Sequence, residues 1–156
     1  MNNTIFYLIG DSNIGRAAVA REVAARTDAR IIDSQDIYAP IFNLVEHKAP
    51  AEIPDGVWVQ VDAVREAILV TIETMSPTEW SFVFAHAGLD IPADVGVYRR
   101  VRATALRRKA RFRPVRLLHG ATKHALLAFD EADALDLDIS ATTPAEAAER
   151  IVAAGS

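Results

Sequence analysis

Cysteine is absent from the 156 residues of this chain, and the chain also has no long apolar run and no basic amino-terminal segment. Without cysteine it forms no disulfide, has no thiolate ligand for zinc and has no cysteine nucleophile. The first four residues carry no basic side chain, and the apolar run 5–9 is too short for a signal peptide or a membrane-spanning helix. We therefore expect a cytoplasmic protein that does not enter a membrane.

Histidines are few as well, and their positions do not indicate a metal site. They stand at 47, 86, 119 and 124, without the spacing of zinc ligands. About half of the residues, 51%, are apolar, which suffices for a sizeable core in a chain that is too short for two domains. We predict a single domain over residues 1–156.

Acidic side chains are missing from one long segment. Nine of the 17 basic residues lie in 99–116, which contains no acid, so 8 basic residues face all 21 acidic residues elsewhere. Such a block can attract nucleic acid or phosphate. Few aromatic residues are interleaved for base stacking, so we favour a solvated helix face over nucleic-acid binding. In this interpretation the outer, solvated face of the helix carries Arg99, Arg102, Arg107 and Arg108. The inner face carries Val97, Val101, Ala105 and Leu106.

The hydrophobic pattern predicts strands that alternate with helices. Residues 4–9 are apolar without polar alternation, which is typical of a strand buried on both faces. Residues 134–140 alternate apolar side chains with aspartate, which favours an edge strand with one wet face. The expected strands are 4–9, 30–32, 80–85, 112–118 and 134–140. The expected helices are 15–26, 36–45, 57–75 and 94–109, followed by a last helix near the end of the sequence. In that last helix Thr143 is the N-cap, Pro144 takes the first helical position and Glu146 closes a capping box.

This order predicts an α/β domain of three layers, α/β/α, around a five-stranded parallel sheet. Ligands bind to such sheets at the carboxyl ends of the strands. Side chains that directly follow a strand are therefore the first candidates for a site.

The segment after the first strand, GDSNIGRA at Gly10–Ala17, has the glycine spacing of a phosphate-binding loop. Glycine at both ends lets the backbone curl so that successive N–H groups point into one concavity, and the following helix adds its positive end. The alternative is a plain tight turn. The residues expected at the phosphate are Gly10, Asp11, Ser12, Asn13, Ile14, Gly15, Arg16, Ala17 and Ala18.

Two residues of this loop depart from the usual pattern. Arg16 replaces a lysine and keeps the positive charge, but its planar fork differs from a compact ammonium. Ala17 replaces a serine or threonine and has no hydroxyl for magnesium. Phosphoryl transfer depends on positioning and charge neutralisation, so both changes should slow chemistry more than they weaken binding.

Several segments together resemble a bacterial P-loop kinase of the small shikimate-kinase and gluconate-kinase type. The similarity covers nearly the whole chain and is carried by Gly10–Ala17 and by residues 29–45, 57–69, 80–90, 101–118 and 135–152. It implies a nucleoside monophosphate kinase-like fold, ATP with Mg²⁺ as cofactors, and phosphate transfer to a small hydroxylated metabolite. Such kinases carry an arginine-bearing lid where this chain has the short region 119–133, in which only Lys123, His119 and His124 could serve.

Four further residues are candidates for the site. The resemblance gives Asp33, at the end of the second strand, the role of orienting a magnesium-bound water or taking the substrate's proton, with Asp36 in reserve; the alternative is that Asp33 or Ser34 caps the next helix. Arg65 either binds an anionic substrate or pairs with Asp62. His86, which ends the third strand, contacts phosphate or substrate, or is a buried, hydrogen-bonded histidine.

Two other functions remain open at this stage. One is a catalytically inactive, pseudokinase-like binding module with the same fold. The other is a serine esterase, because LIGDSN resembles the first block of the GDSL hydrolases with Ser12 as nucleophile. That family activates its serine through an Asp-x-x-His motif, which this sequence lacks, so the esterase is the weaker hypothesis.

Overall fold

The computed structural model describes residues 1–11, 14–46, 52–120 and 126–154. Its strands are β1 (Thr4–Ile9), β2 (Arg30–Asp33), β3 (Phe82–His86), β4 (Arg111–Leu118) and β5 (Leu135–Asp138). All neighbouring strands pair in parallel, and they form one five-stranded sheet in the order β2-β3-β1-β4-β5. The carboxyl ends of all strands therefore lie along one edge of the sheet.

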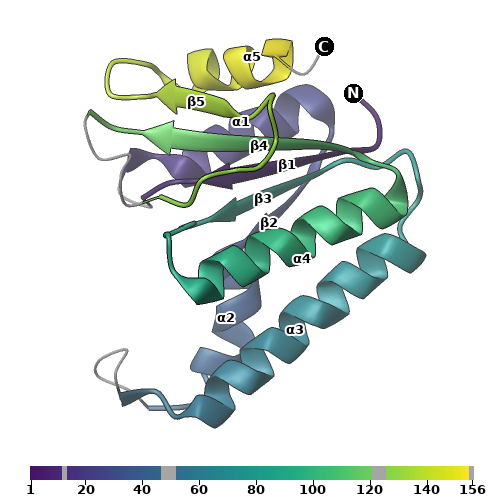
Figure 1. Ribbon diagram of the computed structural model, residues 1–156, viewed down its shortest axis with the longest axis vertical. Coiled ribbons are helices and arrows are strands. Elements are labelled where there is room, and N and C mark those ends of the chain that lie inside the picture. The colour runs from purple at the N-terminus through teal and green to yellow at the C-terminus, as the bar shows by residue number, and fades with distance from the viewer. Residues whose placement is uncertain (12–13, 47–51, 121–125, 155–156) are drawn as a thin grey trace.

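Helices cover both faces of this sheet (Figure 1). They are α1 (Arg16–Thr27), α2 (Ser34–Phe42), α3 (Asp55–Thr74), α4 (Pro92–Arg108) and α5 (Pro144–Ala154). One hydrophobic core joins the sheet to α1 and α5, and a second core joins the other face to α2, α3 and α4. The predicted three-layer α/β/α fold with a five-stranded parallel sheet is confirmed.

The place of β1 in the middle of the sheet explains its composition. All six residues of β1 are buried, because β3 and β4 flank the strand and helices cover both faces. β5 lies at the sheet edge, where Leu137 is buried while Asp136 and Asp138 are exposed. None of the helices among the described residues is long and apolar enough to cross a membrane.

Several element boundaries differ from the expected ones for local reasons. Helix α2 begins at Ser34 because Asp33 caps it, and α4 begins at Pro92, which occupies its first turn. Strand β3 begins only at Phe82, since the amide of Trp80 closes a turn on the carbonyl of Pro77 at 3.1 Å. The last helix has the predicted capping box: Thr143 Oγ1 accepts a bond from the Glu146 amide, and the Glu146 carboxylate accepts one from the Thr143 amide.

Acids that are distant in sequence neutralise the basic segment. The Arg100 guanidinium bonds Glu66 and Glu73 of α3 at 2.7–2.8 Å, Arg107 pairs with Glu73, and Arg102 pairs with Glu131. These contacts join α4 to α3 and to the segment that precedes β5. The segment is therefore largely occupied by contacts within the molecule.

The expected orientation of two side chains on α4 was wrong. Arg108 is buried, 7% exposed, and Leu106 is 67% exposed. The buried stripe runs through Tyr98, Val101, Thr104, Ala105 and Arg108 at helical spacing, and Leu106 lies off it. Arg108 is tolerated inside because its guanidinium donates to the carbonyls of Ile72, Ser76, Pro77 and Trp80, at and beyond the end of α3.

Candidate functional site

The loop between β1 and α1 bends at two glycines. Gly10 has a φ of 155°, and a Cβ there would lie 2.8 Å from the carbonyl oxygen of Leu117, so only glycine fits beside β4. Gly15 has a φ of 95° and is the N-cap of α1. The backbone thus requires glycine at both positions, as it does in a phosphate-binding loop. Ser12 and Asn13 lie outside the described residues.

The amino terminus of α1 faces this loop without a side-chain cap. Gly15 provides no capping side chain, and the first turn contains no acid. The first amides of any helix lack partners within it, so Arg16, Ala17 and Ala18 present N–H groups that have no acceptor among the described residues. Such a helix start attracts an anion.

Arg16 lies across the mouth of the loop. Its Nη1 donates to the carbonyl oxygen of Gly10 at 2.8 Å, and its side chain is buried. Burial lowers the pKa of Arg16, while the charges of Asp33 and Asp11 act in the opposite direction. The arginine remains a cation at physiological pH. A buried positive charge thus stands where the usual loops have lysine.

A cavity of about 540 Å³ opens beside this loop. Its walls include Gly10, Ser34, Ala87 and His119, which directly follow β1, β2, β3 and β4, and Arg16, which begins α1. The cavity therefore lies at the carboxyl edge of the sheet, and the Arg16 side chain forms its wall without filling it. We name it the loop cavity.

Asp33 and Asp36 form a capping box at the start of α2. The Asp33 carboxylate accepts a bond from the Gln35 amide at 3.0 Å, and the Asp36 carboxylate accepts one from the Asp33 amide at 2.9 Å. The expected alternative, that Asp33 caps the helix, is thus present in the structure. The Asp33 side chain also accepts a bond from the Asp36 amide and one from the Ser34 hydroxyl, so the start of α2 engages it closely.

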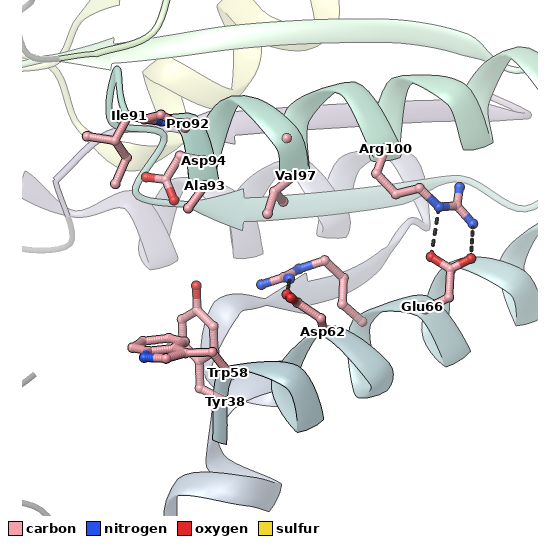
Figure 2. Close-up of a pocket in the computed structure, with 12 residues that line it drawn as sticks. Tyr38, Trp58, Asp62, Glu66, Ile91, Pro92, Ala93, Asp94, Val97 and Arg100 are labelled. Carbon is pink, nitrogen blue, oxygen red and sulfur yellow. Dashed lines mark hydrogen bonds and ion pairs between the residues drawn. The ribbon is translucent and has the colours of Figure 1, made fainter. Parts of the chain in front are cut away.

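A larger cavity of about 710 Å³ lies between α2, α3 and α4. Figure 2 shows Tyr38 and Trp58 on one side of it, Asp94 and Val97 on the other, and the Arg100–Glu66 ion pair at one end. Tyr38 and Trp58 pack edge to face, with ring centroids 6.3 Å apart. We name this space the helix cavity. Its aromatic wall was not identified from the sequence, because these two residues lie 20 positions apart on different helices.

Arg65 belongs to the helix cavity and pairs with Asp62. The distance between Arg65 Nη1 and Asp62 Oδ1 is 2.6 Å, so the predicted pairing is present. Arg65 is 9% exposed, and its Nε has no hydrogen-bond partner among the described residues. The ion pair therefore uses only part of the guanidinium, and the remainder can bind an anion in the cavity.

His86 ends β3 and is buried between aromatic rings. Its ring lies 5.6 Å from that of Tyr7 and 5.9 Å from that of Phe84. The expectation of a buried histidine agrees with this position, but Nε2 has no hydrogen-bond partner among the described residues. Burial, followed by the charges of Arg65 and Arg16, lowers the pKa of His86 to about 3, so the imidazole is neutral.

The described part of 119–133, where the resemblance predicts a short lid, packs on the rest of the fold. Leu126 forms an antiparallel bridge with Leu89, and the Leu127 amide donates to the carbonyl of Gly88 at 3.0 Å. The Tyr98 hydroxyl donates to the Glu131 carboxylate farther along. Lys123 and His124 lie outside the described residues. His119 lines the loop cavity.

The donors beside α1 fit phosphate better than a metal ion. Helix amides and the Arg16 guanidinium are ligands for anions, whereas Mg²⁺ requires oxygen ligands and Ala17 offers no side-chain oxygen. No group of three or more histidine, aspartate or glutamate side chains that could hold a metal ion occurs within 1–11, 14–46, 52–120 and 126–154. The side chains that the structure describes thus do not reproduce the usual magnesium site.

Comparison with known proteins gives matches among solved structures only. No family model and no curated protein matches the chain. The APS kinase of Mycobacterium tuberculosis, solved with AMPPNP and APS, is 10% identical, with 98% of this chain and 97% of that chain covered and a TM-score of 0.63. A gluconokinase from Sinorhizobium meliloti 1021 is 15% identical, with 97% and 91% covered and a TM-score of 0.59. The shikimate kinase of Aquifex aeolicus is 12% identical, with 96% and 94% covered and a TM-score of 0.54. The chain thus has the fold of the small P-loop kinases.

Proposed function

We propose that this chain binds the phosphates of a nucleotide in the loop cavity and transfers phosphate from ATP to a small hydroxylated metabolite in the helix cavity. The observation that carries the proposal is the position of the two cavities. They lie next to each other at the carboxyl edge of a P-loop kinase fold, with α1 pointing its uncapped amino terminus at one of them. A donor and an acceptor bound there would meet near the end of β3.

The described residues divide into three roles in this proposal. The amides at the start of α1 and the Arg16 guanidinium hold the phosphates through charge and hydrogen bonds. Arg65 holds an acidic group of the acceptor. Asp33, at the end of β2, takes the proton of the acceptor hydroxyl. Mg²⁺ bound with ATP would neutralise phosphate charge, and Ala17 would offer it no side-chain oxygen.

A second function is favoured by the loop itself. Arg16 bonds a backbone carbonyl instead of reaching along the loop, and Ala17 has no hydroxyl. A binding module that retains nucleotide affinity without turnover agrees with both features. Its fold and cavities would be those of the enzyme, and only the chemical step would be missing.

Titration of the protein with ATP, with magnesium and then with EDTA, separates the two functions. Magnesium-dependent binding together with phosphate transfer to a hydroxylated acceptor supports the kinase. Binding that is indifferent to magnesium, without turnover over a panel of sugars and hydroxy acids, supports the module. Absence of any ATP binding contradicts both.

A further inference from the structure

An aromatic cluster forms one wall of the helix cavity. Tyr38 and Phe42 stack with ring centroids 5.6 Å apart, and Trp58 packs edge to face against both, at 6.3 and 5.3 Å. Trp58 nevertheless remains 40% exposed, and it lines the cavity together with Tyr38 (Figure 2). The cluster therefore holds the indole in place while much of its surface stays accessible from the cavity.

The other wall of the helix cavity is built from short side chains in the first turns of α4. Pro92, Ala93, Gly96 and Val97 all line the cavity. Glycine within a helix is less favourable than alanine. Outside its own helix backbone, no described atom lies within 4 Å of a Cβ built at Gly96, and its φ is not positive. Neither packing nor backbone conformation thus requires glycine there, and its missing side chain widens the cavity.

The space between Trp58 and this wall of α4 is suited to a flat ring, and we name it the ring slot. Ala93 and Val97 lie across the cavity from Trp58 in Figure 2, so a ring that packs on the indole turns its other side toward apolar groups. Offset and edge-to-face contacts stabilise an aromatic ring beside an indole beyond the effect of its buried area, whereas a saturated ring gains only from burial. The ring slot therefore favours an aromatic ring.

The charged residues of the helix cavity suit one negative charge on the ligand. Arg100 donates to both carboxylate oxygens of Glu66. Arg65 pairs with Asp62 through Nη1, and its Nε has no hydrogen-bond partner among the described residues. Asp94 also lines the cavity and disfavours a more highly charged group such as a phosphate. A single carboxylate bound by Arg65 therefore fits best.

The spacing of Trp58 and Arg65 allows one molecule to contact both residues. They lie seven positions apart on α3, which is about two helical turns or roughly 10 Å along the axis, and both line the helix cavity. A compact molecule with a ring and an acidic group can span this distance.

Resting on the proposed function, we propose that the acceptor in the helix cavity is an aromatic hydroxy acid whose ring packs on Trp58 and whose carboxylate binds Arg65. Its hydroxyl oxygen forms the new bond to the γ-phosphorus of ATP. The bond from that phosphorus to the bridging oxygen of ADP breaks, ADP leaves with the electron pair, and the hydroxyl proton passes to Asp33. This narrows the acceptor from any small hydroxylated metabolite to one with an aromatic ring.

Binding in the ring slot is measurable without ATP through the fluorescence of Trp58. The chain has two tryptophans, so Trp80→Phe leaves Trp58 as the only one. The probes are 4-hydroxybenzoate and the longer 4-hydroxyphenylacetate, and we expect at least one of them to change this fluorescence saturably. The compound trans-4-hydroxycyclohexanecarboxylate carries the same groups on a saturated ring and should bind about fivefold more weakly than 4-hydroxybenzoate.

Variants of the two walls, measured by calorimetry with the ring acid that binds, test the ring slot itself. Trp58→Ala should weaken binding about tenfold, and Trp58→Phe should restore part of the affinity. Gly96→Leu should block the ring while the protein still folds, because open space surrounds Gly96. Gly56→Leu is the matched control, since Gly56 is a helical glycine with equally open surroundings that does not line the cavity, and it should leave the affinity unchanged. Circular dichroism confirms that each variant folds.

The outcomes separate this inference from the proposed function. The inference is overturned if neither ring acid binds, if the saturated analogue binds equally well, or if Trp58→Ala and Gly96→Leu both leave the affinity unchanged in folded protein. Each of these results counts against it even where the protein transfers phosphate to another acceptor. Loss of ATP binding, with a ring acid still bound beside Trp58, overturns the proposed function and leaves the ring slot supported.

Discussion

Arg16 donates a hydrogen bond to the carbonyl oxygen of Gly10, and the two atoms are 2.8 Å apart. The first residue of α1 is thereby tied to the first residue of the loop that precedes it. This bond holds a cation at the loop cavity and also fixes that cation to the protein's own backbone. Substitutions at residues 16 and 17 test how this bond affects nucleotide binding.

Restoring the usual pair of side chains with Arg16→Lys and Ala17→Ser tests the loop. The lysine removes the planar fork from Gly10, and the serine provides the missing oxygen ligand for magnesium. We expect ATP affinity to rise by about tenfold with magnesium and to change little in EDTA, as one gained charge-assisted interaction would cause. Isothermal calorimetry measures both. Unchanged affinity in both conditions would mean that the loop does not bind phosphate.

Asp33 offers a way to separate a catalytic role from a capping role. Asparagine caps a helix about as well as aspartate but cannot take a proton, whereas alanine does neither. If Asp33 is the base, Asp33→Asn should keep the stability of the protein and abolish phosphate transfer. Asp33→Ala should lose transfer and in addition about 1 kcal/mol of stability. Urea denaturation measures the stability, and a coupled kinase assay measures phosphate transfer. Full activity in Asp33→Asn would mean that Asp33 caps α2 and is not the base.

Arg108 should be the most important arginine for stability. Its guanidinium donates to the carbonyls of Ile72 and Pro77 at 2.6 and 2.7 Å, and the side chain is buried. Arg108→Met leaves these carbonyls without donors and should lower the free energy of unfolding by about 3 kcal/mol. Arg107→Met, one position earlier, removes an exposed ion pair and should cost less than about 1 kcal/mol. Chemical denaturation measures both variants. If Arg108→Met and Arg107→Met lowered the free energy of unfolding equally, the assigned role of Arg108 would be contradicted.

Glu73 should make the contact between α3 and α4 dependent on pH. Burial raises the pKa of Glu73, but hydrogen bonds from Arg100 and Thr104 outweigh this and lower it below the ordinary 4.5. A lowered carboxyl pKa stabilises the fold above the ordinary value, and the stabilisation is lost as the pH falls through the folded-state value. Glu73→Gln should therefore cost about 1–2 kcal/mol near neutral pH, and the difference from the wild type should shrink below about pH 4.5.

Denaturation of both proteins across this pH range measures the effect. Glu66→Gln is the control, because the Glu66 side chain is 55% exposed and its pair with Arg100 is weakened by solvent. A difference between Glu73→Gln and the wild type that stays constant from neutral to acidic pH would contradict the role of the Glu73 charge.

Local patterns were sufficient to predict the fold. The apolar run of β1, the alternation in β5 and the capping box at Thr143 each depend on neighbouring residues, and all three are present in the structure. The burial of Arg108 could not be predicted in this way, because its partners are carbonyls that lie about 30 positions away.

The candidate site was predictable where it follows a strand directly. Asp33 and His86 end strands, and parallel strands bring their ends together, so both could be placed from the sequence. The helix cavity could not, because its walls come from the packing of three helices against one another. The unsatisfied nitrogen of Arg65 likewise depends on the depth at which α3 packs, which no local pattern shows.

A crystal structure of the protein grown with ATP tests the central claim most directly. We predict density for phosphate in the loop cavity, within hydrogen-bond distance of the amides at the start of α1, with the Arg16 guanidinium turned toward it. An empty loop cavity at a saturating ATP concentration, with Arg16 still bonded to Gly10, would contradict the account.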